Sequence, residues 1–180
     1  MKATGIVRRI DDLGRVVVPK EIRRTLRIRE GDPLEIFTDR EGEIILKKYS
    51  PIGELSTFAR QYAESLSQTI NCLVGICDMD QIIAASGAGK KDLQDKYISR
   101  LLEKQLEERK QIFAAADEKK YIPVTDGAEE YVYQIIQPII CEGDVIGGLI
   151  LLSKDSKKKL GEMEQKIAAC AAGVLGRQME

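Results

Sequence analysis

Histidine and tryptophan are missing from the 180-residue sequence, and aromatic residues make up only 5% of it. The lack of histidine excludes serine–histidine triads, histidine-containing zinc sites and imidazole acid–base catalysis. Every apolar run is shorter than the roughly 20 residues of a membrane-spanning helix, and the N-terminus has no apolar signal-peptide core. We therefore expect a cytoplasmic protein that has no membrane partner and lies outside the enzyme classes that depend on histidine.

Cysteine is also scarce, with four residues at irregular spacings: Cys72, Cys77, Cys141 and Cys170. Each has apolar neighbours in the sequence, which is typical of reduced thiols in a protein core and not of a disulfide framework. The sequence offers no catalytic residue, no metal site and no cofactor site that we can name, and we predict none of them.

Positive charge is concentrated near the N-terminus of a chain whose formal net charge is only -1. The first 29 residues contain nine basic and three acidic side chains, a net charge of +6, so the rest of the chain carries about -7. A basic face on an acidic protein attracts polyanions, and arginine suits phosphate groups and guanine edges. Exposed arginines are often merely solvated, but that alternative fits scattered charges better than this cluster. Double-stranded DNA is the predicted partner.

The N-terminal region has the pattern of short strands and turns. Gly5–Ile10 and Arg15–Val18 are strand-like and flank the turn residues 11–14, which predicts a hairpin. Pro19 suits the first turn of a short helix, because its missing N–H is not needed there. Strand alternation would place Arg8 and Arg9 on opposite sides.

A second hairpin is predicted from the strand-like runs 34–38 and 43–47, which flank turn residues. Four short strands and one helical turn bury too little apolar surface to be stable alone. We therefore expect residues 1–50 to form a dimer.

The pattern changes after residue 50, where Ser, Pro and Gly interrupt the chain. Apolar residues then recur at three- and four-residue spacing, or in short β-branched runs. Helices are predicted at 55–70, 93–106 and 158–178, and strands at 73–77, 82–85, 131–140 and 145–152. This order predicts an α+β architecture. We divide the chain into a domain at 1–50, a linker at 51–56 and a domain at 57–180.

Three stretches carry a resemblance to the AbrB family of bacterial transition-state regulators: Met1–Leu26, Leu34–Phe37 and Ile44–Tyr49. The resemblance implies a swapped-hairpin β-barrel, in which two chains interleave their hairpins into one core. The family's DNA-contacting arginines match Arg8, Arg15, Arg23 and Arg24. We add Arg9 and Lys2 as expected phosphate contacts.

Residues 54–180 resemble a GAF domain in the order of their elements. An AbrB-type domain followed by a GAF-like domain is similar to a family of sporulation regulators of spore-forming bacteria, which implies a sequence-specific activator and repressor. A ligand of unknown identity would lie between the sheet and the loops 86–92 and 114–127; the alternative is a filled core that serves only assembly. The terminal helices would join two dimers into a homotetramer.

Three other interpretations fit the sequence less well. The run Ser86–Lys91 resembles a phosphate-binding loop, but Ala84 and Lys91 stand where a Walker A motif has glycine and serine or threonine. An antitoxin-like autorepressor would share the swapped-hairpin barrel, yet antitoxins usually end in a disordered tail, whereas this tail has core-forming periodicity. Some GAF-fold proteins reduce free methionine sulfoxide with thiols, but nothing here indicates a lowered thiol pKa.

Overall fold

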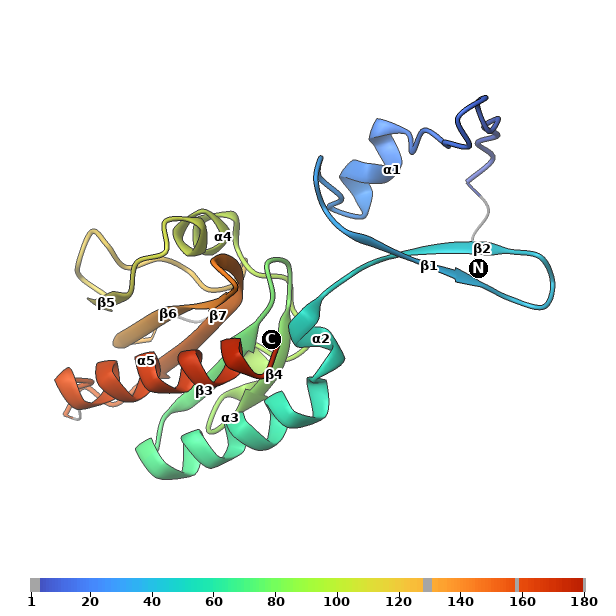
Figure 1. The fold of residues 1–180 in the computed structure, drawn as a ribbon. Helices are drawn as coiled ribbons and strands as arrows, with labels where there is room; N and C mark the ends of the chain where they lie inside the picture. Colours follow the sequence, from blue (N-terminus) through green and yellow to red (C-terminus); the bar gives the residue numbers. More distant parts are fainter. Residues whose placement is uncertain (1–3, 128–130, 158, 180) are drawn as a thin grey trace. The chain divides into compact units, whose positions relative to one another are not determined.

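The chain divides into two compact units, Met1–Tyr49 and Ser50–Glu180 (Figure 1). The computed structural model describes residues 4–127, 131–157 and 159–179. The first unit contains a turn, one short helix and a two-stranded sheet, and the second contains a five-stranded sheet with helices on both faces.

The first unit contains the turn that the sequence predicts at residues 11–14. The amide of Asp11 donates to the carbonyl oxygen of Arg15, and the amide of Gly14 donates to that of Asp11, both at 3.0 Å. Gly14 has a φ of +76°, which glycine adopts without strain. The flanking segments 5–10 and 15–18, however, are not strands in the described single chain. Only the turn of the expected hairpin is therefore present, because the segments 5–10 and 15–18 do not form the hydrogen bonds of paired strands in the single chain.

The other predicted elements of this unit are present. The helix α1 (Lys20–Thr25) follows Pro19, which is its N-cap residue. The strands β1 (Leu34–Thr38) and β2 (Ile44–Lys48) pair antiparallel, with Ile36 opposite Leu46. Both the helix and the second hairpin are confirmed, with β2 shifted by one residue from its predicted position.

The register divides the side chains of this hairpin between two faces, because directly opposed residues of antiparallel strands point to the same side. One side, which we call the apolar face, carries four aliphatic residues, Leu34, Ile36, Ile44 and Leu46, with Thr38 and Lys48 at its two ends. The other side is mixed and carries Glu35, Phe37, Ile45 and Lys47. A hairpin with this division needs a cover for its apolar face.

No residue between positions 4 and 49 is buried in the structure. Ile36 and Ile44 of the apolar face are 67% and 68% exposed, and Val7 is 85% exposed. Leaving apolar side chains in water forfeits about 25 cal/mol for each Å² that could be buried. A single chain therefore does not supply a core for its first unit.

The second unit is built on an antiparallel sheet in the order β4-β3-β7-β6-β5. Its strands are β3 (Leu73–Cys77), β4 (Ile82–Ser86), β5 (Ile112–Ala115), β6 (Tyr133–Cys141) and β7 (Asp144–Ser153). The central strand β7 pairs with β3 on one side and with β6 on the other. From Gly147 onward every residue of β7 is buried, which explains its unbroken apolar sequence.

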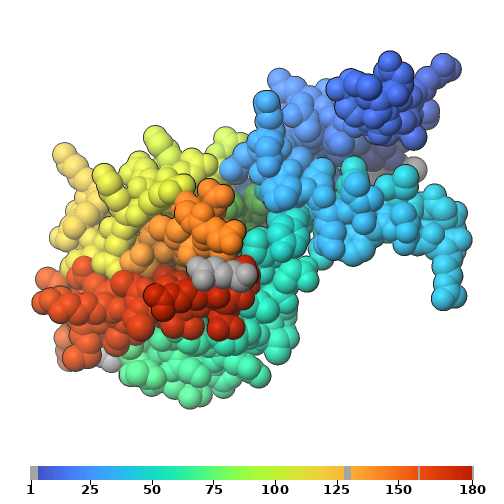
Figure 2. Space-filling model, in the orientation of Figure 1, coloured from blue at the N-terminus to red at the C-terminus, as the bar shows by residue number. Residues whose placement is uncertain are grey.

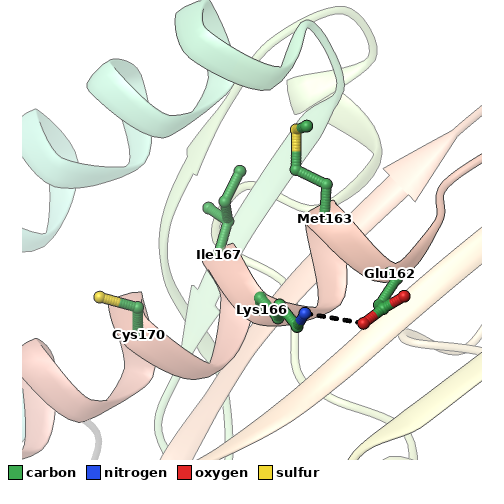
Figure 3. A pocket seen from close by; sticks show the side chains of 5 residues that line it. All are labelled: Glu162, Met163, Lys166, Ile167 and Cys170. Atoms are coloured by element: carbon green, nitrogen blue, oxygen red, sulfur yellow. Dashed lines mark ion pairs between the residues drawn. The ribbon is translucent and has the colours of Figure 1, made fainter.

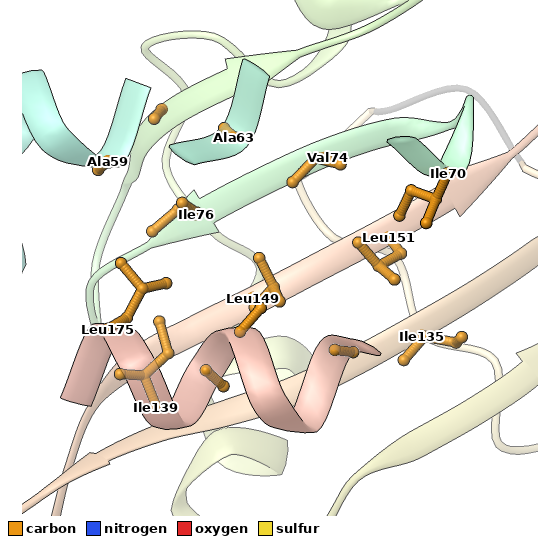
Figure 4. Close-up of a cluster of buried hydrophobic side chains, with 14 of the residues drawn as sticks. Ala59, Ala63, Ile70, Val74, Ile76, Ile135, Ile139, Leu149, Leu151 and Leu175 are labelled. Carbon is orange, nitrogen blue, oxygen red and sulfur yellow. The ribbon is translucent and has the colours of Figure 1, made fainter. Parts of the chain in front are cut away.

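Helices cover both faces of the sheet, which gives three layers (Figures 1 and 4). The helices α3 (Ser56–Ile70) and α5 (Glu162–Arg177) lie on one face, and α4 (Arg100–Glu107) lies on the other. Successive residues of β7 alternate between the two cores: Leu149 faces α3 and α5, and Ile150 faces α4. Within the described ranges, no helix has the length and apolar character that crossing a membrane requires.

The predicted helix over 93–106 is wrong in its first half. A short 3-10 turn, η1 (Lys90–Asp92), is followed by non-helical backbone, and α4 begins only after Ser99. The physical reasons are local: Asp95 has a φ of +58°, and the hydroxyl oxygen of Ser99 accepts from the amide of Leu102 at 3.0 Å as an N-cap. The strand β5 was missed, because it is only four residues long and half alanine.

Residues 51–56 are part of the second unit and do not form the expected linker. The helix α2 (Pro51–Glu54) begins directly after Ser50, whose hydroxyl oxygen accepts from the amide of Gly53 at 3.0 Å. The same hydroxyl donates to Oδ2 of Asp78 in the β3–β4 turn at 2.8 Å. Ile52 is only 1% exposed. The chain is therefore anchored to the core of the second unit within three residues of its boundary.

Replacing Ser50 with alanine is expected to lower the free energy of unfolding of the second unit by about 1 to 2 kcal/mol, because the helix loses its cap and the buried Asp78 loses a donor. Thermal unfolding of the full chain would measure this loss. Ser65→Ala, at an exposed position within α3, is the matched control and is expected to change the stability by less than about 0.5 kcal/mol. Equal effects of the two substitutions would contradict the role of Ser50.

Candidate DNA-binding surface

Arg15 lies immediately after the first turn and is held there by Asp11. Its Nε atom donates to Oδ2 of Asp11 at 2.9 Å, and its backbone amide donates to Oδ1 at 2.8 Å. These bonds from Arg15, with a further bond from the Leu13 amide, lower the pKa of the Asp11 carboxyl. The side chain of Arg15 is nevertheless 70% exposed. The ion pair is made by Nε, and the two terminal nitrogens, Nη1 and Nη2, lie at the end of this largely exposed side chain.

Arg8 and Arg9 lie in the segment before the turn, and both are exposed. Among the described residues, Nη1 of Arg8 donates only to the carbonyl oxygen of its neighbour Val7, at 3.4 Å. The prediction that these two arginines point to opposite sides depends on a strand and stays a prediction. Lys2, the remaining expected phosphate contact, lies outside the described residues.

Arg23 and Arg24 are consecutive residues of α1, so their side chains leave the helix about 100° apart. The helix is positioned by Pro19, whose carbonyl oxygen accepts from the amide of Arg23 at 3.0 Å. Arg24 is exposed, whereas Arg23 is half-buried and its Nε atom is buried without a hydrogen-bond partner in the described part of the chain. A buried donor that lacks a partner is costly, so Arg23 is more than a solvated surface charge.

The predicted arginines come from three consecutive segments, namely residues 8–9, residue 15 and α1. The hydrogen bonds and ion pairs of the described residues link Arg15 to Asp11 but do not link the arginines to one another. Like charges that are held apart on exposed segments produce an extended positive potential. This arrangement suits several separate phosphate groups better than one small enclosed anion.

Sequence reasoning missed the acidic residues that organise this surface. Asp11 was expected only as a turn residue, and its bond to Arg15 was not foreseen. In the same unit, Oδ2 of Asp32 lies 3.0 Å from Nζ of Lys48 and accepts from the amide of Arg29 at 2.8 Å. The available signal was a carboxylate four residues before an arginine across a tight turn, which lets side chain and backbone converge.

A second exposed feature lies on α5, where apolar residues recur at four- and three-residue spacing. We call these residues the α5 stripe: Met163, Ile167, Cys170 and Val174. Met163 is 70% exposed and Val174 is 37% exposed. Figures 1 and 2 show α5 on the same side of the second unit as α3. An apolar stripe on the surface of an otherwise well-packed unit is typical of a protein–protein contact.

The stripe borders an open hollow of about 520 Å³ that is lined only by residues of α5 (Figure 3). Glu162 and Lys166 form its polar edge, joined by an ion pair of 2.7 Å. On α3, burial raises the pKa of Tyr62, and the nearby Cys170 adds to the shift. The hollow is open and is bordered by the stripe, so it is part of the exposed apolar surface of α5 and not an enclosed ligand cavity.

The region where the sequence predicts a ligand pocket is occupied by side chains. Leu93, Val124 and Tyr131 are buried there, in the core shared with α4. The hydroxyl of Tyr131 donates to Oδ2 of Asp92 at 2.7 Å, which fixes the loop before α4. In the described residues this part of the second unit therefore fits the alternative of a filled core.

The four cysteines are thiols: Cys72 lies directly before β3, Cys77 lies in β3, Cys141 ends β6 and Cys170 lies in α5. Cys72 and Cys77 are buried, and burial raises the pKa of the Cys77 thiol, with a smaller contribution from the charge of Asp78. A thiol that stays protonated is a poor nucleophile. Cys77 is therefore a core residue, and not the reactive thiol that a reductase would need.

Two family models match the two units. The model described as stage V sporulation protein T C-terminal, transcription factor, matches residues 54–180. The model described as antidote-toxin recognition MazE, bacterial antitoxin, matches residues 7–54. The antitoxin match is thus limited to the first unit and its boundary, which does not favour an antitoxin as the function of the whole chain.

Individual relatives agree with this division. The chain is 54% identical to stage V sporulation protein T of Bacillus subtilis (strain 168), over all of this chain and 99% of that protein. It is 67% identical over 51 residues to the transition state regulatory protein AbrB of the same organism, which covers 28% of this chain and 52% of AbrB. The cofactor-binding GAF domain of the nutrient sensor CodY from Clostridium difficile has a TM-score of 0.54 at 14% identity, covering 67% of this chain and 83% of that chain.

An AbrB-type first unit and a GAF-type second unit define a transcription factor with a separate DNA-binding domain, and both expected resemblances are confirmed. The match over the whole length is more specific than either half. The chain belongs to the family of stage V sporulation protein T.

Proposed function

We propose that the protein is a sequence-specific DNA-binding regulator of sporulation genes that activates some promoters and represses others. DNA is contacted by Arg8, Arg15, Arg23 and Arg24, with Arg9 and Lys2 binding phosphates. The observation that carries this proposal is the exposure of arginines on three segments of a unit whose first 29 residues have a net charge of +6. Its family, which is one of transcription factors, supports it.

Recognition depends on DNA shape as well as on base contacts. The only helix among the described residues of the first unit, α1, has six residues and is too short to serve as a long recognition helix. Separate arginines on turns and a short helix neutralise phosphates and enter a groove at a few points. We therefore expect a loose consensus sequence, with specificity spread over a deformable stretch of duplex.

The first unit functions as a dimer. It has no buried side chain among its described residues, and its apolar face is open to solvent. Interleaving the hairpins of two chains would bury these apolar side chains and would provide partners for the segments 5–10 and 15–18. The dimer would also double the local charge to +12, which strengthens its attraction to DNA.

Two such dimers join through the second units to form a homotetramer. The α5 stripe, with Tyr62 beside it on α3, supplies the apolar contact. A tetramer carries two DNA-binding dimers, so binding by the first raises the effective concentration of the second at a nearby site. The second unit thus acts without enzymatic chemistry, and control by a small molecule stays a prediction.

Replacing both Arg15 and Arg23 with alanine is expected to weaken binding to promoter-containing duplex by at least about tenfold, because two cationic contacts are lost. It is also expected to reduce the slope of log Kd against log salt by at least about 1, since each cation that neutralises a phosphate contributes about 0.9. Fluorescence anisotropy across a salt series would measure both quantities with the full chain.

The matched control is the double variant Arg60→Ala and Arg100→Ala, which removes the same charge from exposed positions of the second unit. This control is expected to keep the affinity and slope of the wild type. If both double variants behaved alike, the arginines of the first unit would have no special role. Flat salt dependence in the wild type itself would contradict DNA as the partner.

A further inference from the structure

The side chain of Asp11 accepts three hydrogen bonds within the predicted DNA-binding surface. Its Oδ1 atom accepts from the amides of Leu13 and Arg15 at 3.0 Å and 2.8 Å, and its Oδ2 atom accepts from Nε of Arg15 at 2.9 Å. The two oxygens therefore have separate tasks. Oδ1 closes the turn, and Oδ2 orients one guanidinium group.

A carboxylate on this surface opposes DNA binding, because it repels phosphate groups. Without this carboxylate the turn would attract a polyanion more strongly. The neighbouring Asp12 carries the same charge on the same turn and makes none of the three contacts of Asp11. Asp11, unlike Asp12, therefore makes contacts that close the turn and hold the guanidinium group of Arg15.

The geometry leaves the outer edge of Arg15 available. Nε is engaged by Asp11, whereas Nη1 and Nη2 remain at the end of a side chain that is 70% exposed. These two nitrogens form the fork that pairs with O6 and N7 of guanine. Because a free arginine side chain has many rotamers, a bond that fixes its direction before binding reduces the entropy lost in the complex.

We propose that Asp11 is a positioning residue that holds Arg15 in the orientation needed for a base contact, so that it lowers general affinity for DNA while raising specificity. This proposal rests on the proposed function, in which Arg15 contacts DNA. Arg8 offers a contrast within the same surface, since within the described part of the chain its Nη1 donates only to the adjacent backbone carbonyl, at 3.4 Å. Among the arginines predicted to contact DNA, Arg15 is the one whose direction an ion pair sets in the described residues.

The decisive variant is Asp11→Asn in the full chain. Asparagine keeps Oδ1 and so can still accept from the two backbone amides, but its amide nitrogen replaces Oδ2 and cannot accept from Nε of Arg15. Asp12→Asn is the matched control, because it removes the same charge from the next residue. Arg15→Ala and the double variant Asp11→Asn with Arg15→Ala complete a double-mutant cycle.

Each variant would be titrated with a duplex selected by the wild-type protein from a random library, and with the unselected library. We expect Asp11→Asn to bind the selected duplex about tenfold more weakly, at the low end for one bidentate base contact. It should bind the unselected library as well as the wild type or better. Asp12→Asn should tighten binding to both, and the double variant should bind like Arg15→Ala.

A spectroscopic measurement separates positioning from a structural effect. In the wild type the Nε–H resonance of Arg15, assigned by its absence in Arg15→Ala, should be protected from exchange with solvent. In Asp11→Asn this protection should be lost while the amide resonances of Leu13 and Arg15 stay in place. Displacement of those amides together with loss of binding to both DNAs would show that Asp11 only maintains the turn, and would overturn the proposal.

Two further outcomes would also overturn it, and they have different meanings. If Arg15→Ala binds weakly but Asp11→Asn tightens binding to both DNAs as Asp12→Asn does, Asp11 is only a repelling charge, and the role of Arg15 in the proposed function survives. If Arg15→Ala itself binds the selected duplex like the wild type, the DNA contact of Arg15 fails, and its positioning fails with it.

Discussion

Replacing Ile36 with aspartate is expected to reduce the proposed assembly from four chains to two and to abolish DNA binding. Ile36 is 67% exposed in the single chain, where such a change would alter stability by no more than about 0.5 kcal/mol. In a dimer core the same change would bury an unpaired charge, at a cost of several kcal/mol. Light scattering would show dimers held by the second units in place of tetramers.

The matched control for this prediction is Lys47→Asp, which places the same residue on the mixed side of the same hairpin. The control is expected to keep the assembled mass, because Lys47 does not belong to the apolar face. An Ile36→Asp protein that assembles and binds DNA like the wild type would show that the apolar face is not an interface between chains.

Replacing Gly176 with alanine is expected to destabilise the second unit by about 3 kcal/mol, at the upper end for an overpacked core. A Cβ atom at this position would lie 2.1 Å from the carbonyl oxygen of Ile140 in β6. The obstacle is backbone, so it cannot turn away like a side chain, and α5 must separate from the sheet. Thermal unfolding of the full chain would report the loss.

Gly173 is a nearly ideal control, because it lies one turn earlier on the same helix and an added Cβ would meet nothing within 4 Å. Gly173→Ala is expected to stabilise α5 by about 0.5 to 1 kcal/mol through helix propensity alone. Opposite signs for the two substitutions would place the close contact at Gly176. A loss of stability in both would mean that the packing of α5 on β6 differs from the structure.

Periodicity predicted the elements whose own sequence carries a long and regular apolar pattern. The apolar run at 145–152 reappears as β7, and the apolar spacing at 55–70 reappears as α3. Both signals are strong, because each element is long and buries one face or both. The second hairpin of the first unit was also found, since alternating residues flank clear turn residues.

The errors occur where distant contacts override local preference. The apolar spacing that suggested a helix from residue 93 is real, but Asp95 adopts a left-handed conformation and Tyr97 pairs with Gln81 across the loop. In the first unit, the segments 5–10 and 15–18 have strand-like sequences but are not strands in the single chain. Strand formation requires a partner, and sequence pattern does not say which chain provides it.

The candidate site was predictable in composition but not in organisation. Clustering of positive charge identified the arginines, and the resemblance to the AbrB family selected four of them. The link between Asp11 and Arg15 was not predictable, because it depends on how the turn folds back on itself. The half-burial of Arg23 likewise depends on tertiary packing that its charge does not reveal.

Because no side chain between residues 4 and 49 is buried in the single chain, folding of the first unit depends on the concentration of the protein. A fold that only a pair of chains can complete follows mass action, so at low abundance the concentration of folded dimer rises with the square of the chain concentration and the folded fraction rises in proportion to it. In the proposed tetramer the second unit would change this relation, because its pairing would join two first-unit dimers into one assembly. Abundance then sets a threshold, and a small change in synthesis or degradation would switch many promoters together without any signalling molecule.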